Sequence, residues 1–337
     1  MRVISGKYRG RVINIPKDDR IRPTMDRIKE TVFNVIQGYV EGARVLDLFA
    51  GTGNLGIEAN SRYAKEVVFV DNHPDSINLI NKNLKGMEEG TTVVKSDYLL
   101  YLQSVTKPFD VIFVDAPYHC LLGERAVKCI IERDILAEGG VLCYEHDTKE
   151  KLSITLPANY INKEKEMGNV SFNFIYKVNV GIVTGSFDPF TRGHLAIVES
   201  ALEQFDKIYI ACLVNEEKKY LFTPEERLEI IQESINELGK KAGRVEVIFS
   251  EKYACELYKD LRAKALIRSI RNDEDKEYEM LMQKYNDEHG ANTVFVEVPE
   301  AIKRISSTMC REQLKENNYD GIVPSAINKV KEIVEKK

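Results

Sequence analysis

The 337-residue sequence has 48 Lys and Arg against 53 Asp and Glu, a formal net charge of −5, and 43% hydrophobic residues. This length is typical of two domains that each bury a core of their own. The acidic balance excludes a protein that attracts nucleic acid over its whole surface, and no apolar run approaches the length of a membrane span.

The 6 cysteines include no CxxC pair, a pattern that suits reduced thiols in the cytosol. The basic N-terminus lacks the apolar segment of a signal peptide. We therefore expect a cytoplasmic protein that contacts no membrane.

Residues 1–24 are basic and contain Gly and Pro breakers, so we predict a strand-and-turn extension rather than a helix. On charge alone, two interpretations stay open: a solvated surface arm, or an arm that neutralises RNA phosphates through Arg9, Arg11 and Arg22. Thr24 is predicted to cap the helix that follows. The apolar face of this helix comprises Ile28, Val32, Val35 and Ile36.

Residues 44–56 (RVLDLFAGTGNLG) indicate an apolar strand, a glycine-rich turn and the start of a helix. Gly51, Gly53 and Gly56 match GxGxxG, which also fits a dinucleotide-binding fold, so the glycines alone do not decide the cofactor. A carboxylate at the position of Asp47, inside the strand end, is typical of methyltransferases that use S-adenosylmethionine (SAM), where it neutralises the ammonium group of the cofactor.

Two further acidic residues follow predicted strands. Asp71 ends the strand at 67–71, where it would accept hydrogen bonds from the ribose hydroxyls of SAM. Asp97 follows the strand at 92–94 and, together with Ser96, would lie beside the adenine. Carboxyl ends of parallel strands are where such folds bind nucleotides.

The apolar strand at 109–114 runs into residues 115–118 (DAPY). An exocyclic amino group is a weak nucleophile because its lone pair is delocalised into the ring, so a site must accept hydrogen bonds from it. A carboxylate and a backbone carbonyl can do this, while a Tyr ring stacks on a base turned out of its helix. The alternative is a strand end with a Pro turn and an ordinary half-buried Tyr. Because Asp47, Gly51, Gly53 and Asp71 point to the same kind of site, we favour Asp115 and Tyr118 as catalytic residues.

Four segments of the first half are characteristic in combination: 4–11 (ISGKYRGR), 22–33 (RPTMDRIKETVF), 46–53 (LDLFAGTG) and 115–118. Through them the chain resembles the RsmD family, which methylates N2 of a guanine in small-subunit (16S) ribosomal RNA. The resemblance implies a class I, Rossmann-like methyltransferase fold, SAM as cofactor and the small ribosomal subunit as partner. The family usually has Asp-Pro-Pro-Tyr where this chain has Ala116. Since Pro restricts φ, we expect a slower enzyme rather than an inactive one.

Residues 163–177 read as a hairpin with a Gly-Asn turn that closes the first sheet, and no Pro-, Gly- or Ser-rich linker follows. We therefore place the domain boundary after residue 178. Thr223 is predicted to cap a helix with Pro224 at its first position, and a C-terminal helix begins at about Ala326. A strand is predicted from Gly181, and others at 207–213, 245–249, 265–267 and 293–298, in a parallel sheet with crossover helices.

Residues 181–194 (GIVTGSFDPFTRGH) combine a strand, a turn and a helix start without the GxxxxGK[ST] of a P-loop. Thr191–His194 instead match the [HT]xGH signature of nucleotidyltransferases, which attack the α-phosphate of a nucleoside triphosphate. His194 would donate to that phosphate, assisted by the helix dipole. Residues 305–311 (ISSTMCR) offer hydroxyl and N–H groups for the outer phosphates, although a simple N-cap also explains such a cluster.

The second half also contains 184–189 (TGSFDP), 218–227 (KKYLFTPEER), 267–271 (IRSIR) and 277–279 (EYE). With 191–194 and 305–308, these segments resemble the phosphopantetheine adenylyltransferase (CoaD) family. The nicotinate mononucleotide adenylyltransferase family shares some of them, but 218–227 and 277–279 argue against it.

This resemblance implies ATP with Mg²⁺ and 4′-phosphopantetheine as substrates, and His194 as the group that stabilises the transition state. The implied ATP-binding residues are Ser186, Phe187, His194, Ser269, Ile270, Arg271, Glu279, Ser306, Ser307 and Thr308. The implied phosphopantetheine-binding residues are Ser186, Lys218, Ala254 and Arg268. The family has Gly where this chain has Ser269, so ATP affinity falls if that position needs a positive φ.

We therefore predict an α/β protein of two consecutive domains: a SAM-dependent methyltransferase with a basic extension at 1–178, and a Rossmann-like adenylyltransferase at 179–337. The expected activities are guanine-N2 methylation and synthesis of dephospho-coenzyme A. Two alternatives stay open: a methyltransferase half that is weak or inactive and acts as an RNA- or SAM-binding module, or a methyl target that is DNA adenine or a protein amide. Because adenylyltransferases of this family tend to be hexameric, we expect a homo-oligomer through the second domain.

Overall fold

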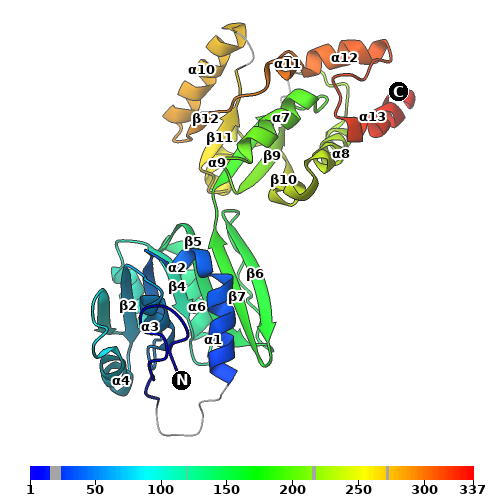
Figure 1. The fold of residues 1–337 in the computed structure, drawn as a ribbon. Coiled ribbons are helices and arrows are strands. Elements are labelled where there is room, and N and C mark those ends of the chain that lie inside the picture. The colour runs from blue at the N-terminus through cyan, green and yellow to red at the C-terminus, as the bar shows by residue number, and fades with distance from the viewer. Residues whose placement is uncertain (16–23, 119, 215–217, 271–272) are drawn as a thin grey trace. The chain divides into compact units, whose positions relative to one another are not determined.

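The computed structural model describes residues 1–15, 24–118, 120–214, 218–270 and 273–337 (Figure 1). It divides into two compact units, each with its own sheet and helices. Unit 1 comprises Met1–Leu156 and Tyr160–Lys177, and unit 2 comprises Pro157–Asn159 and Val178–Lys337. The predicted mixed α/β class with two consecutive folds is confirmed. Within the described ranges, no helix is both long and apolar enough to cross a membrane.

Unit 1 contains a seven-stranded sheet in the order β3-β2-β1-β4-β5-β7-β6. Strands β1 to β5 are parallel, and β7 runs antiparallel to both β5 and β6. The strand bounds are β1 Arg44–Leu48, β2 Glu66–Asp71, β3 Thr91–Lys95, β4 Phe109–Val114, β5 Leu136–Asp147, β6 Tyr160–Met167 and β7 Val170–Lys177. The predicted hairpin is thus confirmed as β6 and β7, and the carboxyl ends of β1, β2, β4 and β5 share one edge of the sheet.

Helices cover both faces of this sheet. Successive strand residues point to opposite faces, so Val45 and Val67 join one apolar cluster while Leu46 and Val68 join the other. The first cluster packs against α1, α3 and α4, and the second against α5 and α6. The helix bounds are α1 Thr24–Val35, α2 Gln37–Val40, α3 Asn54–Ser61, α4 Pro74–Leu84, α5 Tyr98–Ser104 and α6 Leu122–Glu132.

The N-terminal arm is fastened to α3. Residues 1–15 contain turns and an isolated β-bridge, as predicted, and no helix. Glu58 of α3 is fully buried and accepts a hydrogen bond from the backbone N–H of Ile4 at 2.8 Å. The Nζ atom of Lys29 lies 3.3 Å from the same carboxylate and donates to the carbonyl oxygen of Arg2 at 2.7 Å. The buried Lys–Glu pair therefore joins the arm, α1 and α3 into one structure.

Unit 2 contains a five-stranded parallel sheet in the order β10-β9-β8-β11-β12, as the alternation of strands and helices predicts. The strands are β8 Val180–Gly185, β9 Lys207–Leu213, β10 Val245–Ser250, β11 Ala265–Arg268 and β12 Thr293–Phe295. The prediction of a strand to residue 298 was wrong: β12 pairs only with the four-residue β11, and its ladder ends where β11 ends.

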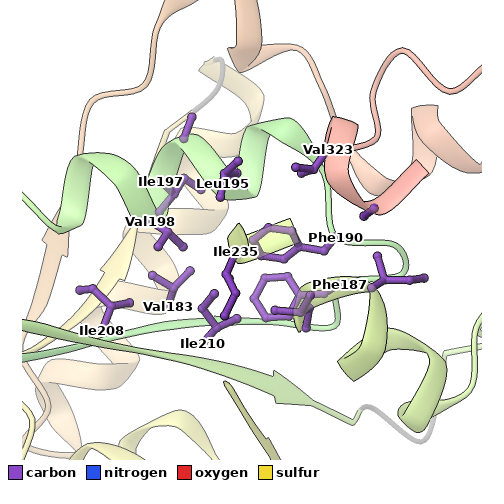
Figure 2. Packing of buried hydrophobic residues seen from close by; sticks show 14 of the residues in the cluster. Val183, Phe187, Phe190, Leu195, Ile197, Val198, Ile208, Ile210, Ile235 and Val323 are labelled. Carbon is purple, nitrogen blue, oxygen red and sulfur yellow. The ribbon is translucent and has the colours of Figure 1, made fainter. Parts of the chain in front are cut away.

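The helices of unit 2 flank this sheet. Their bounds are α7 Arg192–Ala201, α8 Pro224–Ile235, α9 Ala254–Asp260, α10 Asp273–Glu288, α11 Glu300–Lys303, α12 Ser307–Lys315 and α13 Ile327–Glu335, with 3₁₀ helices η1 Asn236–Arg244 and η2 Pro324–Ala326. The predicted cap at Thr223 is confirmed, with Glu226 completing a capping box. Figure 2 shows Phe187 and Phe190 packed among residues of β8, α7 and β9 in the core of this unit.

Candidate active sites

A cavity of about 620 Å³ opens in unit 1 at the carboxyl ends of β1, β2, β4 and β5. Four acidic residues line it, one from each strand end: Asp47, Asp71, Asp115 and Glu145. Gly51, Ala116, Pro117 and Tyr118 also line it. The structure therefore brings together Gly51 of the predicted glycine turn, the predicted carboxylates Asp47 and Asp71, and the 115–118 segment.

Asp47 is a buried carboxylate with a single backbone partner. One of its oxygens accepts a hydrogen bond from the N–H of Gly56 at 2.8 Å, and the residue is only 2% exposed. Burial raises the pKa of Asp47 to about 7; the Gly56 hydrogen bond opposes this, and the charge of Asp71 adds to it. A positively charged ligand group beside Asp47 would relieve this penalty, so the residue fits the ammonium group of SAM.

Asp71 has both carboxylate oxygens turned to backbone donors at the end of β2. It accepts from Gly51 N–H at 2.9 Å and from His73 N–H at 2.8 Å. Gly51 has φ of +54°, a backbone conformation that side chains rarely adopt, so a glycine is needed for the turn to reach Asp71. The arrangement fixes an acidic residue at the cavity wall, where ribose hydroxyls could donate to it.

Two of the predicted SAM-binding residues lie outside the cavity lining. Gly53 precedes α3 with φ of +76°, and an added Cβ would lie 3.3 Å from side-chain atoms of both Ile57 and Phe69. Asp97 caps α5 and accepts from Leu99 N–H at 2.8 Å. Both residues shape elements that surround the site. Of the pair Ser96 and Asp97 expected beside the adenine, Ser96 lines the cavity.

Two hydrogen bonds hold the C-terminal end of the 115–118 segment. Tyr118 donates its hydroxyl proton to Glu145 Oε1 at 2.5 Å, and the Cys120 thiol donates to the Pro117 carbonyl oxygen at 2.7 Å. Burial, together with the charges of Glu145 and Asp47, raises the pKa of Asp115 well above its ordinary value. These contacts restrain a loop that lacks the first Pro of the usual motif.

Glu145 is an acidic residue of the cavity lining that sequence reasoning missed. It lies near the end of β5, where it follows the apolar run Val141–Tyr144. Burial raises the pKa of Glu145, and its hydrogen bond from Tyr118 acts in the opposite direction. The available signal was an acidic residue directly after an apolar strand segment, the same signal that marked Asp71 and Asp115.

The predicted RNA-binding arginines are only partly described. Arg9 and Arg11 are exposed on the arm, and Arg11 donates to the carbonyl oxygen of Lys85. Arg22 lies outside the described residues. An RNA-contacting role for the arm stays a prediction.

In unit 2, His194 occupies the third position of α7 and closes a capping box with Thr191. Its Nδ1 accepts the backbone N–H of Thr191 at 3.0 Å, so the ring proton of the neutral form resides on Nε2. The ring packs between Phe187 and Phe190, with centroid separations of 5.1 and 5.3 Å. His194 is therefore a donor with a fixed orientation at the start of a helix.

The start of α12 packs directly against the start of α7. A Cβ added at Gly193 would lie 2.7 Å from the carbonyl oxygen of Ile305, so only glycine permits this approach. Ser307 donates to the Pro189 carbonyl oxygen at 2.9 Å. Ser306 caps α12, accepting from Met309 N–H at 3.2 Å. The two helix N-termini, which attract anions, thus lie at one place.

Several other residues of unit 2 that were predicted to bind substrates form contacts within the protein. Arg268, at the end of β11, forms a bidentate pair with Glu279 of α10. Ser186, through its carbonyl oxygen, accepts from Arg227 at 2.7 Å, and Thr308 accepts from Arg311 at 3.0 Å. Lys218 is exposed, and Ala254 begins α9. Ser269 and Ile270 follow β11, and Arg271 lies outside the described residues. Among the described residues, no group of His, Cys, Asp and Glu could hold a metal ion.

Comparison with known proteins matches the two halves of the chain to two different families. The family model Conserved hypothetical protein 95 matches residues 1–176, and the Cytidylyltransferase-like model matches residues 182–313. The Ribosomal RNA small subunit methyltransferase D of Haemophilus influenzae is 39% identical over 178 residues, which are 51% of this chain and 91% of the relative. The Phosphopantetheine adenylyltransferase of Streptococcus gordonii is 36% identical over 154 residues, which are 44% of this chain and 92% of the relative.

Among solved structures, the candidate methyltransferase yhhF of Escherichia coli is 30% identical with a TM-score of 0.48, covering 52% of this chain and 97% of that protein. The two curated relatives confirm both sequence resemblances, and the chain is a transferase. It belongs to the Conserved hypothetical protein 95 (RsmD) family over residues 1–176 and to the Cytidylyltransferase-like family, with phosphopantetheine adenylyltransferases as relatives, over residues 182–313.

Proposed function

We propose that the chain is a bifunctional enzyme that methylates N2 of a guanine in 16S ribosomal RNA and adenylylates 4′-phosphopantetheine. The observation that carries the first activity is the cavity that holds Asp47, Asp71, Asp115 and Tyr118 together. The second rests on His194, whose donor nitrogen is fixed where the N-termini of α7 and α12 meet. The matching relatives are named as a small-subunit ribosomal RNA methyltransferase and a phosphopantetheine adenylyltransferase.

In unit 1, SAM supplies an electrophilic methyl group on a positively charged sulfur. Asp47 binds the ammonium group of the cofactor, and Asp71 accepts from its ribose. Asp115 and the carbonyl oxygen of Ala116 accept hydrogen bonds from the guanine amino group, which turns its nitrogen lone pair toward the methyl carbon. Tyr118 would stack on the base. As the N–C bond forms and the S–C bond breaks, S-adenosylhomocysteine would leave and the amino proton would pass to Asp115, which already accepts a hydrogen bond from that group.

In unit 2, the phosphate of phosphopantetheine attacks the α-phosphorus of ATP and pyrophosphate leaves. His194 donates through Nε2 to the α-phosphate oxygens, on which charge grows in the transition state. The α12 N-terminus with Ser306 to Thr308 receives the outer phosphates. Arg268 and Lys218 hold the phosphate of phosphopantetheine, and Mg²⁺ accompanies ATP. The protein acts in the cytoplasm as a homo-oligomer through unit 2.

Transfer of labelled methyl from SAM to small ribosomal subunits tests the first activity, using subunits from a strain that lacks this modification. We expect incorporation by the natural chain and none by Asp115→Ala. No incorporation by folded, SAM-binding protein would instead identify unit 1 as a binding module. Preference for duplex DNA over ribosomal RNA would contradict the proposed target.

Pyrophosphate release from ATP and 4′-phosphopantetheine tests the second activity. We expect His194→Ala to lower kcat by about 100-fold to 1000-fold, the usual effect of removing one transition-state donor. Equal rates for both proteins would remove His194 from the chemistry.

A further inference from the structure

The proposed methyl acceptor has two neighbouring donors on one edge. Guanine presents its N1–H beside its N2 amino group, whereas adenine presents a bare N1 acceptor on the corresponding edge. The motif 115–118 supplies acceptors for the amino group only. A site that selects guanine by this edge needs a further acceptor for N1–H, because an unmatched polar group at a closed site is what rejects the wrong substrate.

Glu145 supplies a second carboxylate next to Asp115 in the cavity. In the parallel pair β4·β5, Val114 lies opposite Tyr144. The next residue on each strand is therefore Asp115 and Glu145, and both line the cavity. Each of these carboxyl groups has a pKa above its ordinary value, chiefly because of burial. Two acceptors at adjacent strand ends match two donors on one base edge.

The contact of Glu145 with Tyr118 leaves room for this role. Tyr118 donates to Oε1 at 2.5 Å, and a carboxylate has about four acceptor sites on its two oxygens. The same side chain can thus orient the ring that stacks on the base and accept a hydrogen bond from the base itself.

We propose that Glu145 is a specificity-determining residue of the methyl-acceptor site, accepting the N1–H of guanine while Asp115 accepts from the amino group. This rests on the proposed methylation of guanine. Adenine would place its N1 lone pair against the Glu145 oxygens and be rejected. The competing role is purely positional, with Glu145 doing no more than holding Tyr118.

A double-mutant cycle separates the two roles. Methyl transfer to small subunits lacking the modification is measured for the natural chain, Glu145→Gln, Tyr118→Phe and the double variant. We expect Glu145→Gln to lower kcat/KM by about tenfold, because a neutral amide oxygen replaces the charged acceptor, and to do so on the Tyr118→Phe background too. If the double variant equals Tyr118→Phe alone, Glu145 acts only through Tyr118 and the proposal is overturned.

A change of the acceptor base gives a readout that folding does not affect. Small subunits are reassembled with 2-aminopurine in place of the methylated guanine, once mass spectrometry has located it; this base keeps the amino group but has no N1–H. We expect the guanine-to-2-aminopurine ratio of kcat/KM to fall at least about tenfold in Glu145→Gln, since the Gln amide can donate to N1. An unchanged ratio refutes the role in specificity.

These outcomes are distinct from failure of the proposed function. If the natural chain methylates no RNA at all, guanine methylation itself fails. If it methylates RNA and Glu145→Gln does so equally well, only the role of Glu145 fails. Pyrophosphate release by unit 2 and SAM binding by unit 1 serve as folding controls in every sample.

Discussion

Binding of SAM should weaken as the pH falls from 8 to 6, because of Asp47. Its carboxyl group has a pKa of about 7 in the cavity, and a cationic ligand binds best to its charged form. Acid protonates Asp47 before the ligand arrives, so binding must then expel a proton. For a group of this pKa, the dissociation constant rises about tenfold between pH 8 and pH 6.

Isothermal titration calorimetry at a series of pH values in this range measures the effect. Asp47→Asn is the matched control: its amide oxygen can still accept from Gly56 N–H, but it carries no charge. We expect this variant to bind SAM weakly with little change over the same range. A flat profile for the natural chain would refute the placement of the cofactor cation beside Asp47. Asp71 and Asp115 face the same cavity but are unchanged in Asp47→Asn, so a pH dependence that they caused would persist in that variant.

The same substitution should stabilise unit 1 in the absence of SAM. The pKa of Asp47 is raised from 3.8 to about 7 by folding, so its contribution to stability is full below pH 3.8 and is lost as the pH rises through 7. At pH 8 the difference corresponds to about 4 kcal/mol as an upper bound. Urea unfolding at pH 8 and pH 5 should show a gain for Asp47→Asn that is larger at pH 8. A gain independent of pH would contradict this reasoning.

Two further predictions concern close packing and buried charge. Gly193→Ala should lower kcat/KM for adenylyl transfer about 100-fold, because its Cβ would lie 2.7 Å from a backbone oxygen and move α12 away from α7. The control Gly243→Ala has open space around its Cβ and should leave the rate unchanged in the same pyrophosphate assay. Lys29→Met should cost about 3 kcal/mol in urea unfolding, because it removes a buried partner from Glu58. Lys128→Met, at an exposed pair, should change stability by less than about 0.5 kcal/mol, and equal effects would refute the argument from burial.

The sequence predicted strands and helix starts well where local chemistry decides them. The capping residue Thr223 and the hairpin at 163–177 are examples, because turn and cap preferences act over a few residues. The end of β12 was predicted too far along the chain, since strand length depends on a partner strand that periodicity does not reveal.

Contacts between elements distant in sequence were the part that could not be predicted. The pair Arg268–Glu279 joins β11 to α10, and both residues had been assigned separately to ligands. Glu145 was missed because strand register, not spacing, sets it beside Asp115. Asp97 was expected at the adenine, and its immediate use as the cap of α5 is an alternative that the residue type equally supports.

The attachment of the N-terminal arm to α3 has a thermodynamic consequence. The buried carboxylate of Glu58 holds the arm to one part of this helix, while Gly56, in the same helix, donates its N–H to Asp47 at the cofactor cavity. A ligand that orders the arm and a ligand that orders the glycine turn thus both stabilise the position of α3. If RNA binds through the arm, bound RNA should raise the affinity for SAM, and bound SAM should raise the affinity for RNA by the same factor, because such linkage is reciprocal.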